Sequence, residues 1–93
     1  MISCDVAERY ALSVLTWLVG QEDLIGLFMG ASGASVEDLK QGAGSPEFLG
    51  AVLDFVLMDD QWVIRFAQEN NEKPDLMMQA RAVLPGGEAV HWT

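Results

Sequence analysis

The sequence predicts an all-α fold, a compact bundle of about six short helices, and three observations predict it. Apolar residues recur at three- and four-residue steps through several segments, which is the period of a helix with one buried face. Capping residues, prolines and glycines stand at the ends of these segments. No segment between turn signals alternates strictly between apolar and polar residues, so no β-strand is predicted.

The first two helices are predicted over the opening third of the chain. The first runs over Asp5–Val19, and its inward face consists of Ala7, Tyr10, Ala11, Val14, Leu15 and Leu18. Gly20 is predicted as its C-terminal cap, because glycine reaches a positive φ without a Cβ clash. The second helix begins at Glu22, where an acidic side chain favours the positive end of the helix dipole, and ends within residues 30–33.

Two serines are predicted to begin the next helices. Ser35 is a good N-cap for a short third helix, which ends in the stretch Gly42–Gly44. Ser45, Pro46 and Glu47 then combine a capping serine, a proline at the first helical position and an early acid. The apolar stripe of this fourth helix consists of Phe48, Leu49, Val52, Leu53 and Val56.

The last two helices have clear ends. The fifth begins at Asp59-Asp60 and ends at Asn70-Asn71, with Trp62, Val63, Phe66 and Ala67 inward. The sixth is predicted to begin at Pro74 and to end before Pro85-Gly86-Gly87, with Leu76, Met77, Ala80 and Leu84 inward. At 93 residues, the chain is long enough for one domain over 1–93, with a C-terminal tail over 85–93.

An internal duplication is predicted from the order of apolar and acidic residues. One constant shift along the chain lays Val14-Leu15 on Val52-Leu53, Glu22 on Asp60 and Phe28 on Phe66. We therefore predict two three-helix repeats, over about 5–43 and 45–84, which pack about an approximate twofold axis. The alternative is that any two pairs of amphipathic helices align equally well.

Charge and cysteine content exclude several classes of protein. The chain has 14 acidic residues against five Lys and Arg, a formal net charge of −9. Five scattered cations form no patch that would neutralise phosphates, so we expect no nucleic acid and no membrane as partner. Cys4 is the single cysteine and cannot close an intrachain disulfide. Without a signal peptide or a membrane span, a cytoplasmic location is expected.

A resemblance to a known family appears at the centre of the chain. The run PEFLGAVLDFVL over Pro46–Leu57, followed by Asp59-Asp60 and Phe66, resembles a bacterial family catalogued as domain-of-unknown-function family 3572. The ending, from Ala80-Arg81 to His91-Trp92, is similar to the same family. The resemblance covers about residues 8 to 93 and implies a small helical cytoplasmic protein. It implies no catalytic or binding residue, because the family has none assigned.

Side chains suited to catalysis or metal binding are scarce. One histidine and one cysteine, far apart in the chain, do not have the ligand spacing of a zinc site. His91 is the only imidazole, and packing or simple exposure in the tail is favoured over a role as a base. Three pairs of neighbouring carboxylates fall in predicted first turns, where they complement the helix dipole: Glu22-Asp23, Glu37-Asp38 and Asp59-Asp60. We expect no enzyme, no cofactor and no metal.

Two functions from different classes remain. The first is an adaptor module that contacts a protein partner, or a second copy in a homodimer, and the negative charge favours a basic partner. Its candidate contact residues are Trp17, Leu57 and Ile64, with the alternative that they complete the core between the repeats. The second function is binding of a small apolar ligand in a cavity between the repeats, lined by Trp17, Phe28, Phe55, Trp62 and Phe66.

Overall fold

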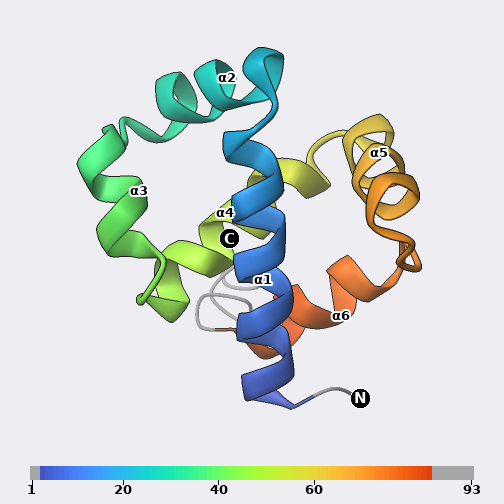
Figure 1. Cartoon of the computed structure of the whole chain (residues 1–93). Helices are drawn as coiled ribbons and strands as arrows, with labels where there is room; N and C mark the ends of the chain where they lie inside the picture. The colour runs from blue at the N-terminus through green and yellow to red at the C-terminus, as the bar shows by residue number, and fades with distance from the viewer. Residues whose placement is uncertain (1–2, 85–93) are drawn as a thin grey trace, which may run out of the picture.

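Two long helices cross at the centre of the molecule, and four shorter ones surround them (Figure 1). The computed structural model describes residues 3–84. In chain order the helices are α1 (Cys4–Val19), α2 (Glu22–Ser32), α3 (Val36–Gly42), α4 (Pro46–Leu57), α5 (Asp60–Asn70) and α6 (Leu76–Val83). The described residues contain no β-strand, so the predicted all-α bundle of about six helices is confirmed.

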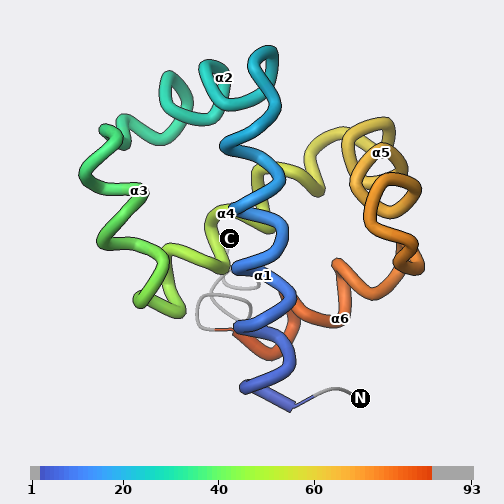
Figure 2. Tube along the Cα trace, in the orientation of Figure 1, coloured from blue at the N-terminus to red at the C-terminus, as the bar shows by residue number. Residues whose placement is uncertain are grey.

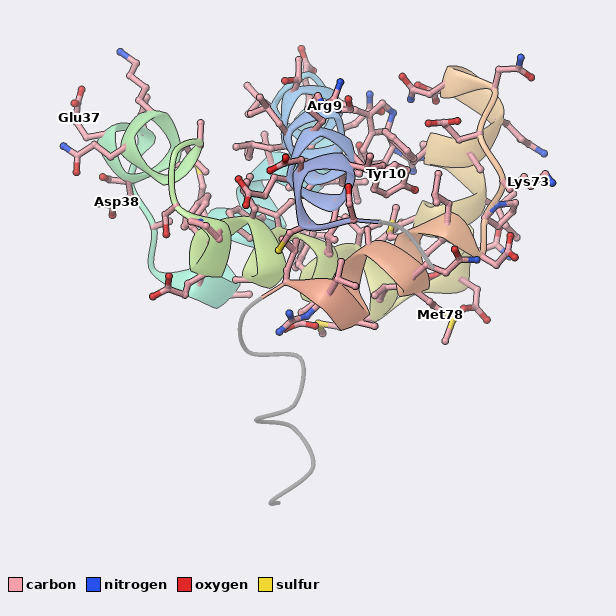
Figure 3. All side chains as sticks on the ribbon, turned by 90° about the horizontal axis from the view of Figure 1, so that it is seen from below. Arg9, Tyr10, Glu37, Asp38, Lys73 and Met78 are labelled. Atoms are coloured by element: carbon pink, nitrogen blue, oxygen red, sulfur yellow. The ribbon has the colours of Figure 1, made fainter. Side chains whose placement is uncertain are left out.

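The arrangement separates the two halves of the chain. α1 lies across α4, and α6 packs against both of them. The trace in Figure 2 shows α2 and α3 on one side of this crossing and α5 on the other. Viewed from below in Figure 3, α3 and α5 again lie on opposite sides of α1.

Side-chain caps fix where most helices begin. Ser3 accepts a hydrogen bond from the Val6 amide at the start of α1, and Ser45 accepts one from the Phe48 amide at the start of α4. At α3, Ser35 and Asp38 form a complete capping box, in which each side chain accepts from the other residue's amide. These oxygens satisfy amides that have no partner within the first turn of a helix.

Two predicted helix ends differ from the structure. Gly20 does cap α1, but at φ −82°, so this cap needs no left-handed residue and the conformational reason for glycine there was wrong. α6 begins at Leu76 and not at Pro74, because Pro74 and Asp75 form a turn that precedes the helix. The Met77 amide donates to the Pro74 carbonyl within this turn.

The core is built from the inward faces of all six helices and contains a chain of aromatic contacts. Phe66 meets Tyr10 and Trp17 edge-on, with ring centroids 5.6 and 5.4 Å apart. Phe55 meets Phe28 edge-on at 5.3 Å and stacks on Trp62 at 4.9 Å. Such offset and edge-on pairs add to the free energy gained by burying the rings.

The two halves of the chain match in the bounds of their second helices but not in the packing of their third helices. The shift that relates the predicted repeats also carries the first and last residues of α2 exactly onto those of α5. The third helices differ, however: α6 packs against both α1 and α4, whereas α3 packs mainly against α4. The duplication therefore stays a prediction, and the first half leaves a face of α1 less covered than the second half leaves α4.

The helices of residues 3–84 are short or carry polar residues. No single helix there has the length and apolar character of a span. Among the described helices, one consecutive pair, α1 and α2, has this length and apolar character when the two are taken together, but a bend of 111° separates them.

Candidate functional site

The three predicted contact residues lie on three different helices and in different environments. Trp17 of α1 is 8% exposed and belongs to the core, where its indole Nε1 donates to Glu69 Oε1 at 2.9 Å. Leu57, at the end of α4, is half-buried and packs against the core. Ile64 of α5 is 40% exposed. Burial leaves little of the Trp17 side chain for a partner, and Ile64 is the most accessible of the three.

The five rings predicted to line a ligand cavity pack in two separate groups in the core. Trp17 packs on Phe66, and Phe55 packs between Phe28 and Trp62. Each ring occupies the space beside its neighbour. Trp17 and Phe28 do line hollows, but these are two different ones at the surface, and no described hollow is lined by all five rings.

An apolar groove lies between α1 and α3, on the side of the molecule away from α5. It has a volume of about 320 Å³, and its lining is mostly apolar: Leu12, Leu15, Thr16 and Val19 from α1, and Val36, Leu39, Lys40 and Ala43 from α3 and its end. Leu15 and Leu39 form the buried floor. Leu12, Val19 and Val36 stand at the sides and are 41, 51 and 55% exposed.

Helix periodicity explains how α1 serves two surfaces. Leu12, Leu15, Thr16 and Val19 follow steps of three and four residues, so they form one stripe along the helix. This stripe overlaps the inward face only at Leu15. The opposite wall comes from α3, in which Val36, Leu39 and Lys40 recur with the same spacing.

In the predicted repeat, the contact that corresponds to α1 with α3 is the contact of α4 with α6. There α6 packs directly on α4, and an ion pair joins the two helices. In that pair Arg81 Nη2 donates to Asp54 Oδ2 at 2.9 Å. The repeat alignment places Ala43 and Thr16 at the equivalent positions of the first half, and these residues have no charges to form such a pair.

A second hollow continues the groove along α1 toward its N-terminal end. It has a volume of about 390 Å³ and is lined by Asp5, Glu8, Arg9, Leu12, Ala43 and Leu49. Leu12 and Ala43 line both spaces. The two hollows therefore form one continuous surface feature, apolar at one end and charged at the other.

Charges around the groove are few and exposed. Lys40 Nζ lies 3.9 Å from Glu37 Oε1, one helical turn away, and both side chains are well solvated. Figure 3 shows Glu37 and Asp38 projecting from α3. The Asp38 carboxylate accepts a hydrogen bond from the Ser35 amide in the capping box. Exposed pairs of this kind contribute little to stability. Lys40 lines the groove, and its side chain is 72% exposed.

The carboxylate pairs serve helix starts and ion pairs. Asp59 caps α5 by accepting from the Gln61 amide, and Asp23 accepts two hydrogen bonds from the Arg65 guanidinium, at 3.3 and 3.2 Å. Hydrogen bonding to Arg65 lowers the pKa of Asp23 below its ordinary value. Within residues 3–84, no group of three or more His, Cys, Asp or Glu side chains is placed to hold a metal ion.

The two remaining reactive side chains are Cys4 and His91. Cys4 is exposed, and its thiol donates to the Val83 carbonyl at 3.5 Å, which places the start of α1 beside the end of α6. His91 lies outside the described residues, as does the predicted tail over 85–93.

Sequence reasoning missed the groove, although its signal was present. Leu12 and Val19 lie two helical turns apart, at the edge of the inward face of α1. Two apolar residues at that spacing make a second stripe beside the core face, which indicates a further contact surface on the helix. The position of Val36 in the sequence did not indicate the groove, because an apolar residue there is equally well explained as an inward residue of a short helix.

Comparison with known proteins identifies the family and nothing finer. A family model described as a protein of unknown function (DUF3572) matches residues 4–87. No curated protein and no solved structure matches the chain. Because the family model spans most of the sequence, the chain belongs to the DUF3572 family.

Proposed function

We propose that this protein is a cytoplasmic, non-enzymatic interaction module that binds an amphipathic helix of a protein partner in the groove between α1 and α3. The observation behind this is the convergence of Leu12, Val19 and Val36, all exposed, above a floor of Leu15 and Leu39. Isolated exposed apolar residues are ordinary, whereas several that border one groove are typical of an interaction surface.

The dimensions of the groove favour a helix as the bound element. Leu12 and Val19 are separated along α1 by about 10 Å, or two helical turns. A partner helix that places apolar residues at i, i+3 or i+4, and i+7 matches this length. Leu15 and Leu39 would receive the central side chain.

Charge supplies the second part of the proposal. The whole chain has a net charge of −9, and the hollow that continues the groove is lined by two carboxylates, Asp5 and Glu8, against one cation, Arg9. A partner with lysine or arginine beyond its apolar stripe complements this end. Long-range attraction of this kind raises the association rate and weakens as salt increases.

Affinity capture from a native lysate at low salt tests the proposal, with Val36→Asp compared against Ile64→Asp. Both substitutions place a carboxylate at an exposed apolar position of a helix, but only Val36 borders the groove. A protein that wild type and Ile64→Asp retain and Val36→Asp loses is then identified by mass spectrometry. Titration calorimetry with the purified protein confirms direct binding.

The opposite pattern overturns the proposal. Loss with Ile64→Asp alone assigns the contact surface to α5, and retention by both variants excludes both surfaces. Sedimentation of the three proteins shows whether the groove instead joins two copies, because then only Val36→Asp shifts a dimer to monomer. Circular dichroism of each variant verifies that the helices are intact.

A small apolar ligand is the second candidate, and the groove volume favours it. About 320 Å³ lies at the lower end of the range of small-molecule sites, which is roughly 300–1,000 Å³. Native mass spectrometry of the purified protein, followed by organic extraction, detects such a ligand. A bound mass that is present in wild type and absent in Val36→Asp supports a ligand over a partner helix.

A further inference from the structure

The last described helix, α6, ends beside the N-terminal end of α1. Leu84 is buried, and the Val83 carbonyl accepts a hydrogen bond from the Cys4 thiol at 3.5 Å. The chain therefore leaves the described bundle beside the first residue of α1. Figure 1 shows this end of α6 on the same side of α1 as α3. Nine residues follow Leu84 in the sequence.

A continuous path leads from this point to the groove. The hollow lined by Asp5, Glu8 and Arg9 begins next to Cys4 and joins the groove at Leu12 and Ala43. From Cys4, the rise of the helix places Leu12 about 12 Å and Val19 about 22 Å along α1. An extended chain spans about 20 Å from Leu84 to Val90 and about 26 Å to Trp92. Both lengths are sufficient for these residues to reach the groove.

The composition of residues 85–93 fits this path. The sequence Pro85-Gly86-Gly87 is typical of a helix stop and of a change of chain direction. Ala89, Val90 and Trp92 follow, and they are the apolar side chains of the segment. Lys40 is the one cationic residue that lines the groove, and the face of a tryptophan ring attracts cations.

We propose that residues 88–92 bind in the α1–α3 groove of their own chain, with Val90 and Trp92 inserted, and that a partner helix must displace them. This inference depends on the groove of the proposed function but not on the identity of any partner. A segment tethered in this way is present at an effective concentration in the millimolar range. Even weak binding by the tail therefore competes with a partner.

Engineered disulfides in the full chain test the contact directly. In a Cys4→Ser background, Thr93→Cys is combined with Val36→Cys at the groove or, as a matched control, with Ile64→Cys on α5. Both helix positions are exposed, so neither pair is expected to disturb the fold. In a glutathione redox buffer, we expect the Val36 pair to form an intramolecular disulfide at least tenfold faster than the Ile64 pair. Replacing Val90 and Trp92 with Asp is expected to remove this difference.

Each other result overturns the proposal. Equal rates for the two pairs mean that the tail has no preference for the groove. Covalent dimers from the Val36 pair, seen on a non-reducing gel, assign the groove to a second copy. A rate that is unchanged by the Asp substitutions excludes Val90 and Trp92 as the inserted residues.

The test separates this inference from the proposed function. If the tail does not bind, partner capture still depends on Val36, and only the competition is lost. If the tail binds and a partner exists, Trp92→Asp increases the amount of captured partner while Val36→Asp abolishes it. If the tail binds and no partner is captured, the groove serves the tail alone and the proposed function fails.

Discussion

Gly33 and Asn71 have the same left-handed backbone conformation, with φ of 74° and 55°, at equivalent positions of the two predicted repeats. Each ends the second helix of its half. The Gly33 amide donates to the Met29 carbonyl, and the Asn71 amide donates to the Ala67 carbonyl. Met29 and Ala67 are also equivalent in the repeat alignment. The two halves thus end this helix in the same way although their third helices pack differently.

The left-handed caps predict different effects of two substitutions on the free energy of unfolding. Gly33→Ala is expected to lower the free energy of unfolding by about 1 kcal/mol, because a Cβ is strained at positive φ. Asn71→Gly is expected to be neutral or slightly stabilising, since glycine adopts this conformation most readily. Urea denaturation measures both.

A helical glycine provides the control for Gly33. Gly30 lies within α2, and a Cβ there meets no atom within 4 Å. Gly30→Ala is therefore expected to raise the free energy of unfolding by roughly 0.5–1 kcal/mol. If Gly33→Ala is as stabilising as Gly30→Ala, the left-handed cap of α2 is contradicted.

Local signals made most helix ends predictable from the sequence. Ser35, Ser45 and Asp59 cap the helices for which they were predicted, because an N-cap depends only on residues within one turn. Pro74 misled the prediction for α6. Proline suits a first helical turn and a preceding turn equally well, and only the packing of α6 on α1 and α4 decides between them.

The candidate site was less predictable, for a physical reason. Trp17 and Ile64 have similar apolar character in the sequence, yet Trp17 is buried and Ile64 is exposed. Helix periodicity identifies one apolar face but not which neighbour covers its edges. That depends on contacts far apart in sequence, such as Trp17 with Glu69 and with Phe66. The groove likewise depends on how far α3 lies from α1.

Phe66 is expected to be among the most sensitive positions of the core. It is 1% exposed and packs edge-on against both Tyr10 and Trp17. Phe66→Ala removes this ring and leaves a cavity, so a loss of about 3–5 kcal/mol in the free energy of unfolding is expected in urea. Met58→Ala, at an exposed position, is the control and is expected to change stability by less than about 0.5 kcal/mol. A loss below about 1 kcal/mol for Phe66→Ala would remove it from the core.

Gly42 is required by the close approach of Phe48. A Cβ at Gly42 would clash with the Phe48 ring at Cδ2, so the ring must move before any larger residue fits. Gly42→Ala is therefore expected to destabilise the protein by about 1–3 kcal/mol, the usual range for overpacking. Thermal unfolding followed by circular dichroism measures the change.

A matched glycine separates this clash from the general effect of adding a methyl group. Gly26 lies within α2, where a Cβ meets no atom within 4 Å. Gly26→Ala is expected to stabilise the protein by roughly 0.5–1 kcal/mol, because alanine is the better helix former. Equal melting temperatures for the two variants would show that Phe48 adjusts without cost.

The burial of the Tyr10 phenol predicts that the protein loses stability at high pH. Figure 3 shows this residue on the side of α1 toward α5 and α6. Burial, with a smaller contribution from the Glu72 carboxylate, raises the pKa of Tyr10 to about 12. In the unfolded chain a tyrosine has a pKa of about 10. The neutral phenol is therefore favoured by folding, and its contribution is full below about pH 10 and is lost as the pH rises through about 12.

The variant Tyr10→Phe isolates this titration from that of the lysines. Its phenyl ring keeps the edge-on contact with Phe66, and it removes a buried hydroxyl that has no hydrogen-bond partner within residues 3–84. We expect the variant to match or exceed wild type in urea at pH 7, since an unsatisfied buried hydroxyl costs free energy. Between pH 10 and 12, the advantage of the variant should grow by up to about 1.4 kcal/mol per pH unit. A difference that stays constant from pH 7 to 11.5 would mean that the phenol ionises as freely in the bundle as in the unfolded chain.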